Sequence, residues 1–300
     1  MEEFKNLKIF CLTYNTKENT LSQEQISELL TPHKNLEYDI YILSFQELER
    51  KTYINIFYSD KSEIESKLIS FFSSSYFNLP SITLGGMYSL IFIKNEHKDF
   101  INDYSNNYIK TGFYGFIGNK GAISIKFKIY NISFLIINCH LIPGEDKIEN
   151  RNKDVNYIYN NICENINSND IIIWSGCFNY RVDALLAQFS NAYIKGKELD
   201  LLEKDQIIKM MNDKENNDVI LNKFNEGKIS FLMSSKYQIG GDTINWTDKR
   251  NYPGWTDRIL FKSSNSEMFS FDINKYDCMK EITFSDHKPV YAYFELKYKI

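Results

Sequence analysis

Residues 171–181 read Ile-Ile-Ile-Trp-Ser-Gly-Cys-Phe-Asn-Tyr-Arg, a short apolar run followed at once by small and polar residues. The apolar half, Ile171–Trp174, is rich in β-branched side chains, which is typical of a buried strand. Asn179 follows that strand within a few positions. Because strand ends in α/β folds converge on a crevice, Asn179 is a candidate for a functional site, although a single residue at this place more often caps or turns the chain.

The same kind of apolar run recurs along the chain and alternates with helical periodicity. We expect strands at Leu7–Tyr14, Tyr38–Phe45, Tyr88–Ile93, Ala122–Ile129, Ile132–Asn138, Ile171–Trp174, Asp257–Lys262 and Val290–Leu296. We expect helices at Leu21–Leu30, Ser62–Phe72, Lys147–Ile166 and Val182–Phe189, with further helical pieces from Lys195 to Phe224. Since no linker divides them, the sequence predicts one α/β domain over residues 1–300, with a buried sheet and helices outside.

The composition is that of a globular protein with a substantial core. The chain has 300 residues, of which 43% are hydrophobic, and its net charge of -4 argues against an extended nucleic-acid surface. Five scattered cysteines without a C-x-x-C pair are typical of reduced thiols. The sequence does not start with a basic region followed by an apolar stretch, the pattern of a secretory signal. No apolar run approaches the roughly 20 residues of a membrane span. We therefore expect a soluble, cytoplasmic protein.

Polar residues stand at the ends of five expected strands. Any one of them fits a cap or a turn, but their repetition at strand ends favours a shared crevice. The candidates are Asn15, Gln46, Glu47, His140, Asn179, Asp286 and His287.

These side chains suit metal-assisted hydrolysis of a phosphoester. Mg²⁺ prefers hard oxygen ligands and usually takes one or two carboxylates, leaving places for water and phosphate oxygens. Glu47 is the expected metal ligand, with Asn15 and Asp286 in support. The sequence therefore predicts Mg²⁺ as the cofactor.

Three more polar side chains suit the phosphate itself. His140, Asn179 and His287 are expected to donate hydrogen bonds to the phosphoryl oxygens as charge develops on them. A carboxylate paired with His287 would fix its tautomer and favour the imidazolium. Asp257 is the candidate partner, and a surface carboxylate paired with arginine is the alternative for that residue.

Basic residues lie inside or beside these segments. Arginine and lysine recognise phosphate by charge-assisted hydrogen bonds. Gly118–Gly121, with Gly112 ahead of it, has the composition of a phosphate-cradling loop, although such turns are common. The expected substrate-binding residues are Lys120, Arg151, Tyr180, Arg181, Lys236, Lys249, Arg258 and Lys288.

In this order the segments resemble the inositol polyphosphate 5-phosphatases of the exonuclease–endonuclease–phosphatase superfamily. Asn179–Arg181, Trp255–Leu260 and Ser285–Pro289 carry the parts most specific to 5-phosphatases. The resemblance implies a DNase I-like α/β/β/α sandwich and Mg²⁺-dependent removal of the 5-phosphate from an inositol polyphosphate or phosphoinositide, with no nucleic-acid partner. The matching landmarks are Tyr14-Asn15, Phe45–Glu47, Gly118–Gly121, Asn138–Leu141, Arg151–Asp154, Asn179–Arg181, Pro253–Leu260 and Ser285–Val290.

Cys177 departs from the family's pattern, which has an aspartate here to orient or deprotonate the attacking water. A thiol with an ordinary pKa of about 8.5 is only a few per cent thiolate at neutral pH. Loss of a general base costs about 10²–10⁴ in rate, so we expect a slowed or inactive enzyme that still binds its ligand. A cysteine phosphatase is disfavoured, because Arg181 follows Cys177 by four positions and not six.

A second departure concerns the substrate. The tyrosine and arginine that help the family hold a 4-phosphate are Ser235 and Asn251 here. Lys236 and Lys249 remain, and Arg250, one place away, is a candidate to compensate in part. Recognition of a 4-phosphate is therefore in question. Leu84–Met87 corresponds to a loop that touches lipid in some family members, which would add a peripheral membrane contact; an ordinary loop before a strand is the alternative.

Three hypotheses for the function therefore remain. We expect the chain to be monomeric. The first is a 5-phosphatase impaired by Cys177, and the second is a silent phosphoinositide-binding pseudophosphatase. The third is a nuclease or other phosphodiesterase of the superfamily, against which Arg181, Asp257–Leu260 and the acidic pI weigh.

Overall fold

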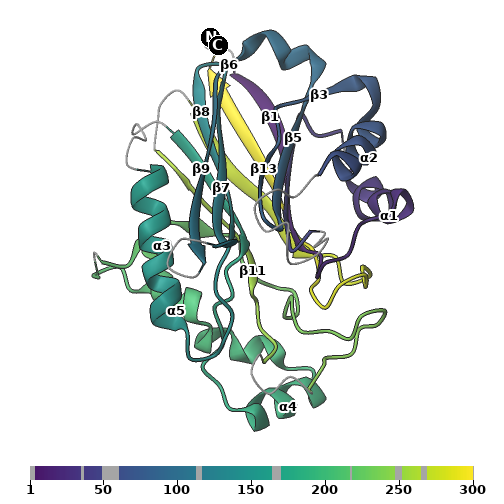
Figure 1. The fold of residues 1–300 in the computed structure, drawn as a ribbon. Coiled ribbons are helices and arrows are strands. Elements are labelled where there is room, and N and C mark those ends of the chain that lie inside the picture. Colours follow the sequence, from purple (N-terminus) through teal and green to yellow (C-terminus); the bar gives the residue numbers. More distant parts are fainter. Residues whose placement is uncertain are drawn as a thin grey trace.

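The described strands form two mixed β-sheets that pack face to face, with helices outside them (Figure 1). The structure, a computed structural model, describes residues 4–34, 37–48, 61–112, 117–163, 170–216, 218–246, 252–264 and 269–299. This arrangement is the expected two-sheet sandwich. Each expected strand is present, with its ends shifted by a few residues.

The first sheet places the first and last described strands side by side. Its order is β12 (Phe269–Cys278), β13 (Val290–Lys299), β1 (Phe4–Asn15), β2 (Ile40–Gln46), β5 (Met87–Lys94) and β3 (Tyr76–Asn78), with β4 (Ile82–Leu84) also on β5. β1 pairs antiparallel with β13, from Phe4 opposite Lys299 to Thr13 opposite Val290. β1 and β2 are parallel, so both end on the same side.

The second sheet, like the first, contains one central pair of parallel strands. Its order is β10 (Asn225–Glu226), β11 (Asp257–Ser263), β9 (Asp170–Cys177), β8 (Ile132–His140), β7 (Ile117–Ile129) and β6 (Ile101–Gly112). β8 and β9 are parallel, with Ser133 opposite Asp170 and His140 opposite Cys177. The carboxyl ends of both parallel pairs therefore carry the candidate residues.

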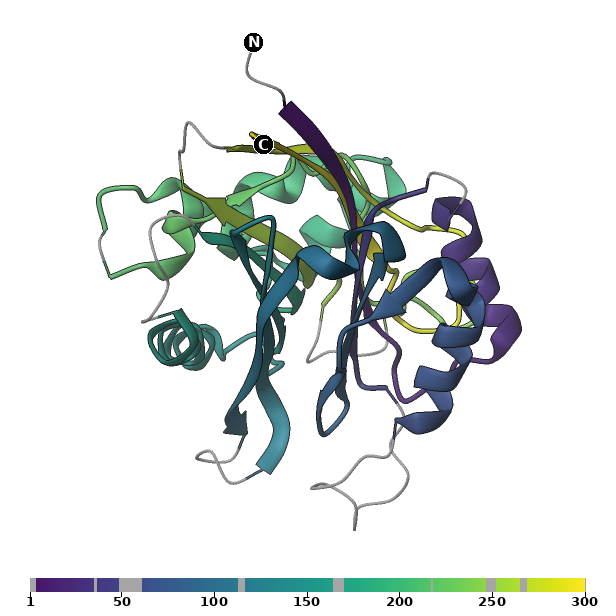
Figure 2. The same ribbon diagram turned by 90° about the horizontal axis from the view of Figure 1, so that it is seen from above.

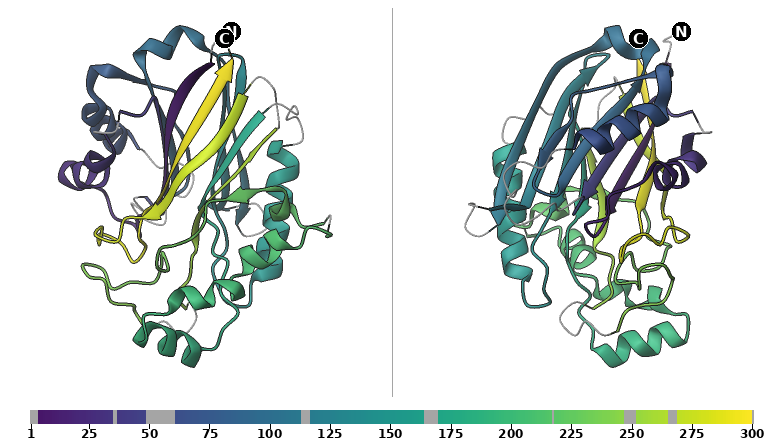
Figure 3. Two further views of the ribbon diagram at one scale, coloured as in Figure 1. Left: turned by 180° about the vertical axis from the view of Figure 1, so that it is seen from behind. Right: turned by 45° about the vertical axis from the view of Figure 1, so that its right-hand side comes forward.

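Helices cover the outer faces of the sandwich. Seen from above, α1 (Gln23–Lys34) and α2 (Ser62–Phe72) lie on one side and α3 (Ile148–Cys163) on the other (Figure 2). α4 (Leu186–Ile194) lies beyond one end of both sheets (Figure 3). The remaining helix is α5 (Gln206–Asn212), and 3₁₀ turns occupy Ser73–Ser75, Asn95–Phe100, Glu198–Lys204 and Ile220–Lys223. No helix in the described ranges is long and apolar enough to cross a membrane.

Strand alternation explains why both faces of the first sheet are apolar. Ile9 and Cys11 of β1 lie in the core between the sheets. Phe10 and Leu12 lie on the opposite face, in the cluster that α1 and α2 complete. Successive side chains of a strand point to opposite faces, so a strand covered on both sides reads as a continuous apolar run.

Two local expectations were wrong. The helix expected from Val182 begins only at Leu186, because Val182 forms an isolated β-bridge with Asp205. The loop expected at Gly118–Gly121 lies within β7, where Gly121 has φ 140° and no side chain to keep the β6 backbone away. Gly121 therefore allows the close pairing of β6 with β7.

Candidate active site

The polar residues expected at the strand ends converge. Across the second sheet, Cys177 lies opposite His140 on one side and Asp257 on the other. Asn15, at the end of β1, contributes a hydrogen bond to Cys177. Oε1 of Glu47, just after β2, lies 3.4 Å from Nε2 of His140. The ends of the two sheets thus meet around Cys177.

Asp257 and His287 form the expected pair. Oδ2 of Asp257 lies 2.7 Å from Nδ1 of His287, and both side chains are buried. Ser234 and Thr256 donate hydroxyl hydrogen bonds to the same oxygen, at 2.8 and 2.9 Å. These bonds fix the carboxylate, and the carboxylate fixes the orientation of the imidazole. The sequence pattern did not single out Ser234.

Glu47 sits in a cationic environment. Nζ of Lys120 lies 2.6 Å from Nε2 of His140, the nitrogen that also faces Glu47. Burial would raise the pKa of Glu47, but the charges of His140 and Lys120 outweigh it and lower the pKa to about 2. Glu47 also has φ 50°, a left-handed conformation that costs energy outside glycine and clusters at functional sites.

Cys177 is buried, and its surroundings keep the thiol protonated. Burial raises its pKa well above the ordinary value, and the charge of Asp257 raises it further. Lys120 and the hydrogen bond from Asn15 act in the opposite direction but do not outweigh burial. The thiolate fraction at neutral pH is therefore lower than the few per cent of an unperturbed cysteine.

Asn179 and Arg181 lie together beyond β9. Asn179 has φ 57° and donates from Nδ2 to the carbonyl of Leu141 at 2.8 Å. Its Oδ1 accepts from Nη2 of Arg181 at 3.1 Å, so the amide orientation is fixed. Arg181 also donates to the carbonyl of Tyr252 at 3.1 Å and lies 3.9 Å from Glu145.

Asp286 links two lysines to the site. Nζ of Lys236 lies 3.0 Å and Nζ of Lys17 lies 3.9 Å from its Oδ2. Burial would raise the pKa of Asp286, but His287 and the two lysines lower it below its usual range. Lys17, two residues beyond Asn15, was not among the expected site residues; its place just after a strand end was the available signal.

Arg151 and Tyr180 are engaged in the protein interior. Nη1 of Arg151 donates to the carbonyls of Ile142 and Gly144, at 3.2 and 2.7 Å. Its Nη2 donates to Gln206 at 3.3 Å, and the guanidinium lies 5.2 Å from the Tyr180 ring centroid. This geometry supports a structural role, and a direct contact with substrate stays a prediction.

Arg258 is likewise enclosed. Nη1 lies 2.9 Å from Oδ1 of Asp205, and Nη2 lies 2.5 Å from Oε2 of Glu226. The Arg258 and Asp205 side chains have no exposed surface, and that of Glu226 is 6% exposed. The guanidinium therefore joins β11 to β10 and to the cap of α5.

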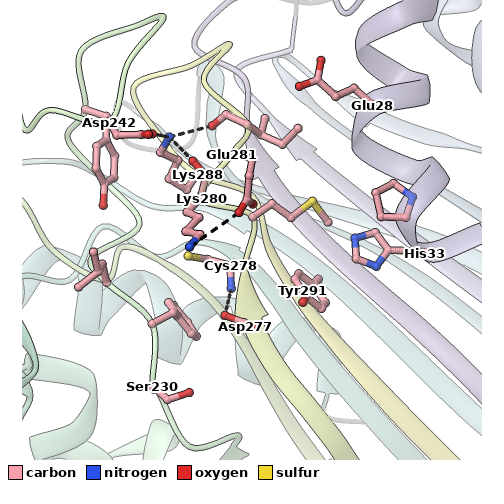
Figure 4. A pocket seen from close by; sticks show the side chains of 16 residues that line it. Glu28, His33, Ser230, Asp242, Asp277, Cys278, Lys280, Glu281, Lys288 and Tyr291 are labelled. Atoms are coloured by element: carbon pink, nitrogen blue, oxygen red, sulfur yellow. Dashed lines mark hydrogen bonds and ion pairs between the residues drawn. The ribbon is translucent and has the colours of Figure 1, made fainter.

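Lys288 lines a cavity of about 800 Å³ (Figure 4), and the lining of this cavity includes no residue of the cluster around Cys177. Its Nζ donates to Asp242 at 2.6 Å and to the carbonyls of Lys280 and Ile282. The cavity also contains the exposed carboxylate of Glu281 and the thiol of Cys278. Lys288 therefore anchors the loop that precedes β13.

Two sequence expectations concern the edge of the site. Lys249, Arg250 and Asn251 lie outside the described residues. Leu84–Met87 forms the tight turn between β4 and β5, and both end side chains are buried in the core between the sheets. The alternative of an ordinary turn before a strand fits this segment, and a membrane contact stays a prediction.

A buried polar network joins the sheets beneath the site. Nε2 of Gln46 on β2 donates to Oδ1 of Asn138 on β8 at 2.8 Å, and Asn138 donates to Ser89 at 3.1 Å. Ser175 on β9 donates to Ser44 on β2 at 3.0 Å. The sequence analysis missed this network, whose signal is the small polar residues inside apolar strands.

Known proteins are similar to this chain in sequence and in fold. A profile of the endonuclease/exonuclease/phosphatase family 2 matches residues 12–293. The type II inositol 1,4,5-trisphosphate 5-phosphatase of Mus musculus is 29% identical over 99% of this chain and 30% of its own length. The phosphatidylinositol 3,4,5-trisphosphate 5-phosphatase 2A of Danio rerio is 32% identical over 86% of this chain and 21% of its own. The chain thus spans less than a third of either relative.

A solved structure extends the comparison. The inositol polyphosphate 5-phosphatase domain of a synaptojanin, in complex with inositol (1,4)-bisphosphate and calcium, has a TM-score of 0.82 and 28% identity. The match covers 99% of this chain and 86% of that domain. The chain therefore belongs to the endonuclease/exonuclease/phosphatase family. Within that family, the expected resemblance to the inositol polyphosphate 5-phosphatases is confirmed.

Proposed function

We propose that the chain hydrolyses the 5-phosphate of an inositol polyphosphate or phosphoinositide, with Mg²⁺ as cofactor, and that Cys177 slows the reaction. The observation that carries the proposal is the convergence of the Glu47–His140 and Asp257–His287 pairs on Cys177. The names of the relatives support this substrate class.

Cationic side chains at the site suit a phosphorylated ligand. Lys120 lies beside His140, and Lys17 and Lys236 lie beside Asp286. These ammonium groups balance carboxylates that surround the same space, and they suit phosphate as compact charges. His140 and His287, whose imidazole Asp257 orients, can donate hydrogen bonds to phosphoryl oxygens in the transition state.

Glu47, Asn15 and Asp286 are the residues that would hold Mg²⁺. Glu47 is ionised at neutral pH, and Lys17 acts on both carboxylates, so the two face a common space. Oδ1 of Asp286 is buried and has no hydrogen-bond partner among the described residues. A hard cation would satisfy such an oxygen, so the donor set fits Mg²⁺. When bound, Mg²⁺ would stabilise the charge that develops on the phosphoryl group.

Cys177 occupies the position from which an aspartate activates water in the family. A buried, protonated thiol is a poor acceptor for the proton that the attacking water must lose. The Glu47–His140 and Asp257–His287 pairs are present, and they can bind and orient the phosphate without the missing base. We therefore expect slow turnover with retained affinity.

The test compares the parent chain with Cys177→Asp in Mg²⁺-dependent phosphate release from inositol phosphates and short-chain phosphoinositides. We expect the Asp variant to be faster by about 10²–10⁴, the usual contribution of a general base. Cys278→Ser, at the separate cavity, is the matched control and should leave the rate unchanged. Equal rates for parent and Cys177→Asp would show that the thiol does not limit turnover. Inactivity of both would overturn the substrate assignment, and plasmid DNA in the panel would reveal a nuclease.

A binding role without turnover is the second candidate. The combination of a protonated Cys177 thiol with retained Lys120 and Lys236 favours it. Calorimetry with an inositol phosphate would then give the same affinity for the parent and for Cys177→Ser, and neither would release phosphate.

A further inference from the structure

A small cavity beside α4 is lined mainly by aromatic and aliphatic side chains, and its volume is about 110 Å³. Phe189 and Tyr193 reach it from α4, and Tyr237 and Trp246 reach it from the segment that precedes β11. The rings of Tyr193 and Trp246 meet edge to face, with centroids 5.6 Å apart and 75° between their planes. This aromatic cavity is smaller than the roughly 300–1,000 Å³ of a site for a drug-sized ligand, so it suits one small group.

Glu198 brings a negative charge to the aromatic cavity. It lines the cavity from the start of the 3₁₀ turn Glu198–Lys204, and only 8% of the residue is exposed. Among the residues that the structure describes, none forms a hydrogen bond or an ion pair with its carboxylate. Burial of a carboxylate without a partner costs free energy, which a cation beside it offsets. Glu198 therefore favours a ligand with a positive charge.

Asp242 is the second carboxylate of the aromatic cavity, but it already has a cationic partner. Its Oδ1 lies 2.6 Å from Nζ of Lys288, which lines the larger cavity (Figure 4). The same ammonium group lies 4.8 Å from the centroid of the Tyr237 ring. Glu198 is thus the one unpaired charge of the described lining, and one of the lining rings already contacts a cation.

The lining distinguishes a quaternary ammonium ion from a primary one. A primary ammonium group carries three N–H donors, each of which needs an acceptor. Apart from the two carboxylates, the lining residues are aliphatic or aromatic, and the hydroxyl of Tyr237 donates to the carbonyl of Met233 at 2.7 Å. A trimethylammonium group has no N–H and is attracted to the faces of aromatic rings. The aromatic cavity therefore suits a trimethylammonium group.

We propose that the aromatic cavity binds the trimethylammonium group of a choline compound. Glu198 balances the charge of this group, and the rings of Tyr193, Tyr237 and Trp246 contact its methyl groups. The binding requires no turnover at Cys177, so it does not rest on the proposed function.

Free choline and the headgroup of a choline phospholipid both carry this group. Leu232, which lines the aromatic cavity, is 47% exposed, and Leu199, the neighbour of Glu198 in the chain, is 39% exposed. These two apolar side chains would give a lipid surface a contact beside the cavity. The experiment therefore includes both sources.

The fluorescence of Trp246 provides the test. The other two tryptophans, Trp174 and Trp255, are fully buried, so a ligand in the aromatic cavity should mainly change the emission of Trp246. We expect choline chloride to change this emission to saturation in the full chain. The neutral alcohol in which carbon replaces the choline nitrogen has the same shape and should have little effect. This comparison uses only the parent chain, so it decides even where a variant fails to fold.

Variants measured by calorimetry separate the charge from the rings. Glu198→Gln should weaken choline binding at least about tenfold, because the ammonium ion loses the buried carboxylate that balances it. Trp246→Leu should weaken it about 2–30-fold, the size of a cation–π contact. Glu203→Gln removes an exposed carboxylate from the same 3₁₀ turn, and this matched control should keep the parental affinity.

Sedimentation with phosphatidylcholine vesicles distinguishes the two sources. Vesicle binding that Glu198→Gln weakens would support the lipid headgroup, and choline binding without vesicle binding would support free choline. Three results would overturn the proposal: a parent chain that does not respond to choline, equal binding of the neutral alcohol, or parental choline affinity in Glu198→Gln. Phosphate release enters none of these measurements, so the choline site and the proposed hydrolysis can fail separately.

Discussion

Glu47 shows how neighbours decide the charge of a single enclosed side chain. Its side chain is 28% exposed, and burial by itself favours the protonated form. The nearby charges of His140 and Lys120 favour the carboxylate more strongly and lower its pKa from an ordinary value of 4.5 to about 2. The carboxylate is therefore available to a cation over the whole physiological pH range.

This shift predicts an acid dependence of stability. A carboxylate whose pKa is lower in the folded than in the unfolded state adds stability that is complete above the unfolded pKa and is lost as pH falls through the folded pKa. For Glu47 that window runs from pH 4.5 down to about 2. We expect the free energy of unfolding to fall less steeply across this window in Glu47→Gln than in the parent, as measured by urea unfolding. Parallel curves would contradict the low pKa.

Arg258 and Lys236 are both basic residues near family motifs, and the structure separates their roles. We expect Arg258→Met to lower the free energy of unfolding by about 3–5 kcal/mol, because it leaves Asp205 and Glu226 buried without their cation. Lys236→Met, which removes one partly enclosed partner of Asp286, should mainly weaken phosphate binding. Urea unfolding and ligand titration of both variants check this. An Arg258→Met protein of parental stability would disprove the structural role.

These residues show what a motif can and cannot reveal. Asp257 and His287 were predicted as a pair, because the family pattern fixes both positions. The same pattern marks Arg151 and Arg258 as basic, but it does not say whether a guanidinium faces a ligand or a buried carboxylate. Burial depends on side chains such as Asp205, which are distant in sequence and carry no signal of their own.

At the scale of elements, the site depends on how β2 and β8 are held across the sandwich. Asn138 and Gln46 bond to each other between opposite sheets. Glu47 follows Gln46 directly, and His140 lies two residues beyond Asn138. A polar bond inside the core therefore sets the spacing of the two strands that carry Glu47 and His140.

Asn138→Ala tests this bridge. The substitution removes a buried amide that accepts from Gln46 and donates to the carbonyls of Phe45 and Tyr88, which should cost about 1–3 kcal/mol in unfolding free energy. In a chain that also carries Cys177→Asp, it should reduce phosphate release, because the Asn138–Gln46 bond no longer holds the strands that carry Glu47 and His140. Asn161→Ala, on the exposed face of α3, is the matched control and should change stability by less than about 0.5 kcal/mol. A similar effect of both changes would argue against the bridge.

The strands that the sequence analysis found carry either a continuous apolar run, as in β2, or a regular apolar alternation, as in β7. β6 was missed, since polar residues such as Ser105–Asn107 are exposed along it. The start of α4 was misplaced because Val182 fits a helical pattern but pairs with Asp205. An edge strand and an isolated bridge both depend on a distant partner, which local periodicity does not record.

At the scale of the whole molecule, β1 and β13 are adjacent strands inside the first sheet. Phe4 lies opposite Lys299, so the first and last described residues are neighbours in this sheet. Gly196 lies in an exposed turn with nothing near its α-carbon on the side where a Cβ would stand. The start of β1 and the end of β13 can therefore be joined by a linker, and the chain can be opened at Gly196.

A circular permutant joined by a short flexible linker and reopened at Gly196 should fold cooperatively. We expect it to lose about 1–2 kcal/mol of unfolding free energy, from a few backbone hydrogen bonds in the opened turn. Reopening between Asn138 and Cys139, inside β8, should prevent cooperative unfolding, because that strand pairs on both sides. Urea unfolding distinguishes the two permutants. Equal behaviour would mean that strand order does not govern stability here.

The pairing of β1 with β13 also determines when the site can form during synthesis. Ser285 donates a hydrogen bond to the carbonyl of Asn15, and His287 follows two residues later. Glu47 and His287 are 287 − 47 = 240 residues apart, which a ribosome translating roughly 5–20 residues per second covers in about 12–48 s. For that interval the nascent chain carries Glu47, the proposed metal ligand, without His287. The proposed site can therefore assemble only after His287 has been synthesised, and a chain that stops before His287 lacks it.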